Sequence, residues 1–344
     1  MNLTEFSKRV LVASGIVLGV ILSGLFIWFA FDIILIIFAG CLLAVLFHGV
    51  SSGIAKYTPL PTRFWLTLLI ILSLAGIISG TWFYGRMFYS HFNQLTESLT
   101  AAANQLMAQY EFARKFFSEI TRLINQLSQL DILANIRTFF STTIGFLFNA
   151  FIIYFLGIYI AIEPHTYVNG FLQLFPAGYQ PRMKQVISHV YHMLKWWLLG
   201  RIVSMISIGL LTVIGLWILN IPLPLTLATL AAMLEFIPYL GPILSAFPAI
   251  IIALTVSPLT SLYVAILYFI IQQIEGYVIT PIIHEEAIAM PPAITLAIQI
   301  FFGILAGSIG LIMASPFSAT LIVLIQMLYV QDIQHNDVKV LGEH

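Results

Sequence analysis

Long blocks of apolar residues alternate with short polar stretches along this chain. The blocks cover residues 10–31, 33–50, 64–84, 144–162, 198–219 and most of 223–329. Each is near or above the ~18–20 residues that cross a bilayer as a helix. Because they lack the period-two alternation of a barrel strand, and because backbone amides find no water in lipid, helices are the remaining solution. The pattern predicts an all-α, polytopic membrane protein.

The composition agrees with this prediction and argues against some functions, including nucleic-acid binding and cysteine-based metal binding. Of the 344 residues, 60% are apolar and 8% are charged, against about 25% charged in an average soluble domain. The formal net charge is zero, so no nucleic-acid partner is expected. The single cysteine, Cys41, allows neither an internal disulfide nor a cysteine-based metal site. We expect membrane lipid and a small-molecule or ion substrate as partners, and neither a metal nor a cofactor.

The first 50 residues suggest two membrane passes. A single helix over residues 10–50 would be about 60 Å long, twice the ~30 Å hydrocarbon thickness. We therefore expect a turn near Asp32. Lys8 and Arg9 precede the first pass, and Lys56 and Arg63 follow the second. By the positive-inside rule both basic regions, and with them the N-terminus, lie in the cytoplasm.

A polar but strongly patterned insert separates the blocks at 64–84 and 144–162. Its apolar residues step by three and four from Phe92 to Leu127, which is a heptad seam. The insert is either an amphipathic helix along the headgroups or a helix that joins subunits. The expected regions are N-terminal transmembrane helices, the insert, a transmembrane helix with a cytoplasmic connector, a core transport domain and a cytoplasmic tail, at residues 1–85, 86–141, 142–197, 198–330 and 331–344.

Two of the apolar blocks contain residues that interrupt helices. In 223–256 the interruption is Glu235-Phe-Ile-Pro-Tyr-Leu-Gly-Pro, with Pro238, Tyr239, Gly241 and Pro242 at the break. In 292–329 it is Gly307 to Gly310, followed by Pro316, and Pro281 ends the helix between the two blocks. Paired interrupted segments indicate the binding site of a transporter. The sequence leaves open whether these broken segments cross the membrane or re-enter from one side.

Charged and amide side chains are scarce in this region and therefore informative. Between 202 and 283 the acidic residues are Glu235 and Glu275; Gln272 and Gln273 precede Glu275, and Arg201 stands just before the region. A carboxylate at bilayer depth is unfavourable by about 2.5–3.5 kcal/mol on insertion scales. We interpret the five as ion-coupling candidates. The alternative is that the acids only cap or brace the broken helices.

The region from Gly215 to Pro316 resembles the autoinducer-2 exporter family of bacterial membrane proteins. The resemblance is carried by Gly215–Pro222, Glu235–Pro242, Gln273–Gly276, and then Pro281, Pro291 or Pro292, Gly307, Gly310 and Pro316 in order. It implies a multi-pass helical protein of a bacterial membrane, which we expect to be the inner membrane; the charge distribution above places the N- and C-termini in the cytoplasm. It also implies a homo-oligomer, for which a pentamer is one option, and export of small solutes; some members are described as sodium/proton antiporters. Arg201 departs from the pattern, which has an uncharged polar residue after Gly200.

The leading hypothesis is a secondary exporter of a small polar solute such as autoinducer-2, coupled to a proton or sodium gradient. A sodium/proton antiporter, a channel and a non-transporting scaffold remain alternatives. The chain has no Gly-x-x-x-x-Gly-Lys-Ser/Thr motif for ATP, and Ile288 replaces the second histidine of the zinc-protease motif that begins at His284. We therefore do not expect an enzyme.

Overall fold

Helices make up all the regular structure in the described part of the chain. The computed structural model describes residues 3–79, 148–279, 281, 291–335 and 340, and isolated positions between 94 and 108. The expected all-α class is confirmed for these residues. The helices are α1 (Leu3–Ala55), α2 (Thr62–Ser79), an unlabelled helix Phe148–Ile162, α6 (Pro164–Leu172), α7 (Gln180–Ile218), α8 (Pro224–Leu234), α9 (Leu240–Val256), α10 (Pro258–Ile274) with the π-helical turn η2 (Glu275–Ile279), and α12 (Pro292–Leu324) with the π-helical segment η3 (Ile325–Gln331).

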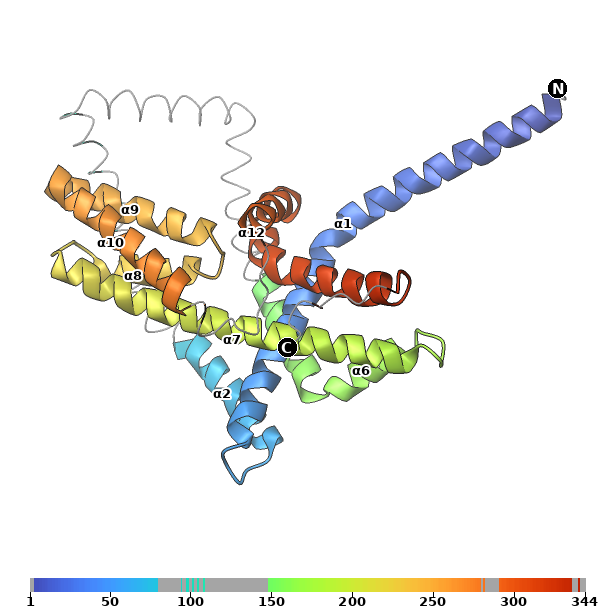
Figure 1. Ribbon diagram of the computed structural model, residues 1–344, viewed down its shortest axis with the longest axis horizontal. Helices are drawn as coiled ribbons and strands as arrows, with labels where there is room; N and C mark the ends of the chain where they lie inside the picture. The colour runs from blue at the N-terminus through green and yellow to red at the C-terminus, as the bar shows by residue number, and fades with distance from the viewer. Residues whose placement is uncertain are drawn as a thin grey trace.

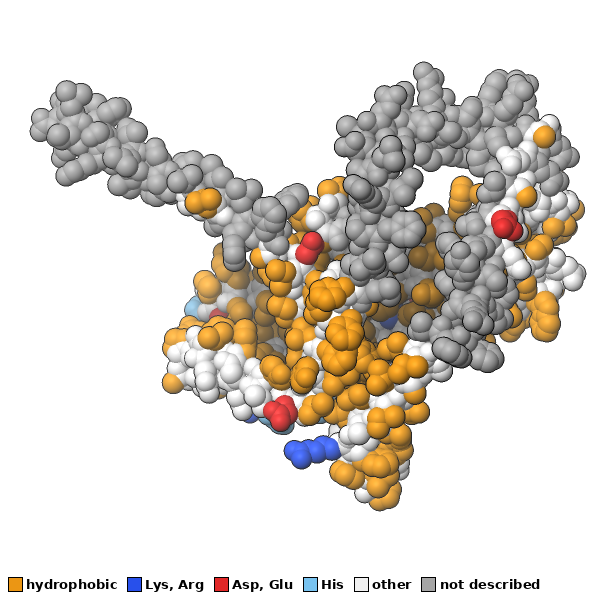
Figure 2. All heavy atoms as spheres, turned by 180° about the vertical axis from the view of Figure 1, so that it is seen from behind, with side chains coloured by type: hydrophobic (Ala, Val, Ile, Leu, Met, Phe, Trp, Pro, Cys, Tyr) orange, Lys and Arg blue, Asp and Glu red, His pale blue; other side chains and the backbone are white. Residues whose placement is uncertain are grey.

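Several of these helices are suited to lipid. Five are long and apolar enough to cross a membrane, and a sixth span results if Phe148–Ile162 is counted with α6, from which it is bent by 87°. Large hydrophobic side chains such as Trp217, Phe269 and Ile304 are exposed on the monomer, and hydrophobic side chains cover much of the face seen in Figure 2. Such a surface is stable only against lipid or other apolar partners. The protein is therefore a polytopic membrane protein.

The turn expected near Asp32 does not exist. Helix α1 is continuous over 53 residues from Leu3 to Ala55, about 80 Å at 1.5 Å per residue, and its N-terminal part extends away from the other helices (Figure 1). The physical reason is that no proline or glycine lies between Leu25 and Ala39. A single aspartate in an apolar run removes no backbone hydrogen bond, so the helix passes through it.

Helix α7 organises the rest of the molecule. Helices α8, α9 and α10 stack beside its C-terminal half, and α6 lies beside its N-terminal half (Figure 1). Helix α7 also packs against α1 and α12. The largest buried cluster lies at this junction and joins Leu35 and Leu42 of α1, Trp197 of α7 and Phe302 of α12. Helix α7 thus contacts both interrupted segments, at α8 and at α12.

Two sequence expectations cannot be compared with the structure. The heptad pattern of the 86–141 insert lies outside the described residues, apart from the isolated positions, and so does the stretch from His284 to Ile288. Both remain predictions.

Candidate functional site

The first interruption falls at the predicted residues. Helix α8 ends at Leu234 and α9 begins at Leu240. Tyr239 has a positive φ of 63°, a backbone conformation that residues other than glycine rarely adopt. Pro238 has no amide hydrogen to continue the helix, and its carbonyl accepts the Leu240 amide at 2.7 Å. The break is therefore a specific backbone structure between two packed helices.

Gly241 is required by close approach of the chain to itself. A Cβ atom at this position would collide with the carbonyl oxygen of Leu234 and lie 2.6 Å from its carbon. Real Cβ atoms do not come this close to backbone atoms. Because α9 turns back directly beneath the last turn of α8, only glycine fits, and the two short helices form a hairpin.

The second interruption also falls where the glycines predict it. Within α12, Ala306 and Gly307 have non-helical backbones, with φ of −130° and 58°. Phe302 and Phe317 would lie about 22 Å apart along a straight helix, but their ring centroids are 5.6 Å apart. A Cβ atom on Gly310 would collide with the Phe302 carbonyl oxygen. The two halves of α12 therefore fold back on each other at Gly307, as α8 and α9 do at Tyr239.

A buried amide joins the two interruptions. Gln299 of α12 is fully buried, and its Nε2 donates to the Pro238 carbonyl at 2.9 Å. The same Nε2 lies 3.5 Å from the hydroxyl of Ser315, across the fold in α12. One side chain thus contacts the first break and both halves of the second. The sequence analysis did not identify Gln299. It could have been found as the one amide side chain in the apolar run 292–306.

An arginine from α7 reaches the first break. Arg201 Nη1 lies 3.7 Å from Glu235 Oε1, and both side chains are largely buried, at 12% and 3% exposed. The guanidinium also lies 6.0 Å from the centroid of Trp197, one helical turn earlier, and Trp197 packs edge-to-face on Phe236. The Nε of Arg201 is buried and has no hydrogen-bond partner among the described residues. An ion pair with a spare donor thus lies beside the broken backbone.

Glu275 belongs to the same electrostatic environment. It is 8% exposed and begins the π-helical turn η2, a distortion that is frequent at functional sites. Gln272 Nε2 donates to Glu275 Oε2 at 3.2 Å, and the charge of Arg201 interacts with Glu235, Glu275 and Tyr239. Four predicted residues, Arg201, Glu235, Gln272 and Glu275, are therefore brought together. Gln273 is exposed on the opposite side of α10 and is not part of this group.

The remaining predicted helix-breaking residues differ in their positions. Pro242 lies in the first turn of α9, where a proline needs no amide partner. Pro316 is buried inside α12, past the fold at Gly307. Pro281 is an exposed helical residue after η2. The fold in α12 is therefore made at Gly307 and Gly310, and Pro316 lies in its second half.

A cavity of about 270 Å³ lies beside the second break. It is lined by residues of α1, α2, Phe148–Ile162 and α12, including Ile309, Ile312 and Met313 just after the fold. Its polar lining residues are Asn149 and Tyr154, and none of Arg201, Glu235 or Glu275 contributes to it. The cavity is thus apolar and separate from the charged group.

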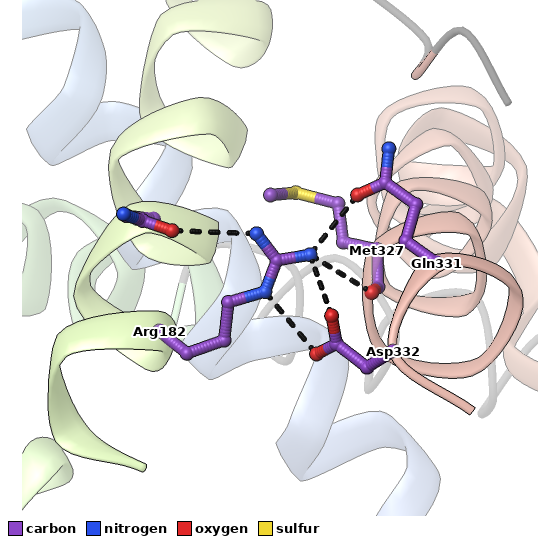
Figure 3. A network of polar contacts seen from close by, with 5 residues as sticks. Arg182, Met327, Gln331 and Asp332 are labelled. Atoms are coloured by element: carbon purple, nitrogen blue, oxygen red, sulfur yellow. Dashed lines mark hydrogen bonds and ion pairs between the residues drawn. The ribbon is translucent and has the colours of Figure 1, made fainter. Parts of the chain in front are cut away.

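A second polar network ties α7 to the chain that follows α12 (Figure 3). Arg182 forms an ion pair with Asp332 at 2.9 Å and donates to the Met327 carbonyl and to Gln331 at 3.1 and 3.0 Å. Its Nη1 donates to Gln185 at 3.3 Å. The sequence analysis missed this network because its members are about 150 residues apart. It fixes the N-terminal end of α7 to the C-terminal end of η3.

Comparison with known proteins places this architecture among transporters. The sequence profile of the AI-2E family of transporters matches residues 17–329. YrrI of Bacillus subtilis, provisionally named a transport protein, is 32% identical over 43% of this chain and 42% of its own length. YueF of the same organism, also provisionally named a transport protein, is 25% identical over 61% of this chain and 57% of its own length. The chain thus aligns with about half the length of these relatives. With the profile matching nearly all of it, this chain belongs to the AI-2E transporter family.

Proposed function

We propose that this chain is a secondary transporter that exports a small polar solute, such as autoinducer-2, and is driven by a proton or sodium gradient. The observation that carries the proposal is the charge count beside the first break. Glu235 and Glu275 supply two carboxylates and Arg201 supplies one guanidinium. Burial of a carboxylate disfavours its charged form, which suits a group that loads and releases a cation. In this proposal a proton or Na⁺ binds at Glu235 and Glu275, and its binding is linked to solute movement.

The interrupted hairpins supply the moving parts in this proposal. Backbone at a break in a membrane helix is tolerated where it is buried or lines a path for solute. Glu235 lies at the first break, and Gln299 connects that break to the second. Neutralising Glu235 weakens its attraction to Arg201, and the hairpin of α8 and α9 is then released to shift against α12. Loading of the cation thereby changes access to the solute path.

Flux measurements on the full chain in proteoliposomes test the coupling. With labelled autoinducer-2 as probe, we expect a proton or sodium gradient to accelerate flux in the native protein. E235Q and E275Q should lose this acceleration, while E163Q, a change at an exposed glutamate before α6, should retain it. Gradient-driven flux that is undiminished in E235Q and E275Q would contradict the assignment. Saturable, exchange-accelerated flux distinguishes this carrier from a channel.

The same charge count favours sodium/proton antiport as a second candidate. If the bound cation is itself the cargo, then Na⁺ and a proton compete for Glu235 and Glu275, and no organic solute is needed. Proteoliposomes that contain a pH indicator and receive Na⁺ alone test this candidate. Proton efflux driven by Na⁺ in the absence of any solute would support it over the exporter.

We further propose an inner-membrane location with both termini in the cytoplasm and a homo-oligomeric assembly, with a pentamer as one option. The basic residues of the 182–195 region support a cytoplasmic side for the connector before the core domain. Because α1 is one continuous helix, its two ends no longer share a side by a two-pass count, and the N-terminal orientation rests on Lys8 and Arg9 near the start of α1. The many exposed hydrophobic side chains support apolar partners in addition to lipid. Labelling of cysteines introduced at Ser7 and Gln334 from each face, together with cross-linking in membranes, tests both points.

A further inference from the structure

Four basic side chains from three separate segments gather at the end of α1. His48 lies on α1 and Lys56 follows its last residue; His165 is on the first turn of α6, and Lys195 is in the middle of α7. His48 interacts electrostatically with His165 and Lys195, and Lys195 interacts in the same way with Lys56. The titratable neighbours of His48 and Lys195 are therefore themselves basic residues.

The fold holds two of these basic groups, His48 and Lys195, side by side. The aliphatic stem of Lys195 packs on Gly49 so closely that a Cβ there would lie 3.0 Å from Lys195 Cγ. The His48 ring packs edge-to-face on Tyr191 at 6.1 Å. Gly49 thus admits α7 to the surface of α1 and places Lys195 beside His48. Packing on Gly49 and Tyr191, and not attraction between opposite charges, thus places Lys195 and His48 side by side.

The group lacks a counter-ion in the part of the chain that is described. Neither ion pair between described side chains, Arg182 with Asp332 or Arg201 with Glu235, involves any of the four. His48 Nδ1 is buried and has no hydrogen-bond partner there, while Lys56 and His165 are exposed. The cluster thus has an open side and an unpartnered polar atom beneath it. Repulsion within it is relieved if an anion binds.

The location of the cluster indicates which anion. Helix α1 ends at Ala55, Tyr57 is 92% exposed, and α6 departs at 87° from the apolar helix Phe148–Ile162. Such a right-angle turn after an apolar span, with exposed aromatics, is typical of the headgroup level of a membrane. We propose that His48, Lys56, His165 and Lys195 form a binding site for a phosphate group, as carried by an anionic phospholipid or by free phosphate.

Binding to the purified full-length protein in detergent tests the site. The probes are dihexanoyl-phosphatidylglycerol, dihexanoyl-phosphatidylcholine and inorganic phosphate, and the readout is the Kd of each. We expect phosphatidylglycerol to bind more tightly than phosphatidylcholine. K56Q and K195Q should each weaken that binding about fivefold, the effect of one lysine near an anionic headgroup. K184Q, an exposed lysine of α7 outside the cluster, should leave it unchanged.

Competition by inorganic phosphate distinguishes a lipid headgroup from free phosphate as the bound anion. Other results would contradict the proposal. Inorganic phosphate that binds and displaces phosphatidylglycerol supports a free-anion site, whereas phosphate that does not compete supports a lipid headgroup site. Equal binding of both lipids without phosphate binding would overturn the proposal, as would an equal loss in K184Q. Because Lys56 is exposed, K56Q tests the site even if K195Q disturbs the packing on Gly49.

Discussion

Gln299 donates to the carbonyl oxygen of Pro238 at 2.9 Å, so the second interrupted segment holds the broken backbone of the first. The donor is fully buried, and its Oε1 has no partner among the described residues. Buried amides are usually satisfied at both ends. An unsatisfied acceptor at the contact between the two hairpins is consistent with a contact that is made in one state of the transporter and changed in another.

Q299M should separate the stability of this contact from its function. The Pro238 carbonyl keeps its bond from the Leu240 amide, and methionine removes the unsatisfied Oε1 while retaining the side-chain volume. Because the carbonyl stays hydrogen-bonded, the loss is that of one net hydrogen bond, about 0.5–1.5 kcal/mol, and the thermal midpoint in detergent should fall only slightly. Gradient-driven flux should fall at least tenfold.

The control for Q299M is S318A. Ser318 is also buried, but its hydroxyl donates to carbonyls of its own helix, at Ala314 and Ser315. Its loss should leave flux near the native value. Native flux in Q299M would show that the link between the hairpins has no role in transport.

The two glycines at the folds should tolerate no side chain. G241A and G310A each place a Cβ against a backbone carbonyl, of Leu234 and Phe302 respectively. Because backbone atoms of a packed hairpin cannot move aside easily, each should lower stability by several kcal/mol. G76A is the matched control, since a Cβ there meets nothing within 4 Å and alanine favours a helix. Monodisperse yield and thermal midpoint measure the effect, and native-like midpoints for G241A and G310A would contradict the folded-back geometry.

The interruptions were predictable because proline and glycine act locally. Pro238 with Gly241, and Gly307 with Gly310, remove donors or permit unusual backbone angles whatever surrounds them, so the sequence placed both breaks correctly. The turn near Asp32 was wrong for the converse reason, since segment length alone does not end a helix without a breaking residue. Gln299 with Pro238, and Arg182 with Asp332, are long-range contacts. They depend on how hairpins and helices dock, which periodicity in one segment does not encode.

The Arg182 network should contribute a modest, salt-dependent stabilisation. Arg182 and Asp332 are 29% and 27% exposed, and pairs near the surface are worth about 0.2–1 kcal/mol. A double-mutant cycle of R182Q and D332N should therefore give a coupling of about 1 kcal/mol or less at low salt, and a smaller value at 1 M NaCl. R182K should restore only part of it, because lysine cannot also reach the Met327 carbonyl and Gln331 with a planar fork. A coupling that is unchanged by salt would contradict an electrostatic origin.

Arg201 should be more important for stability than any exposed charge. R201M leaves Glu235 in the protein interior without its cation, and breaking a buried pair from one side lowers stability by about 3–5 kcal/mol. The double variant R201M/E235M removes both members of the pair, and an apolar replacement of similar volume is often neutral, so its thermal midpoint should return toward the native value. Gradient-driven flux should stay absent in both variants, because the double variant recovers the fold without the carboxylate. A double variant as unstable as R201M would show that Arg201 acts through its packing on Trp197 and not through Glu235.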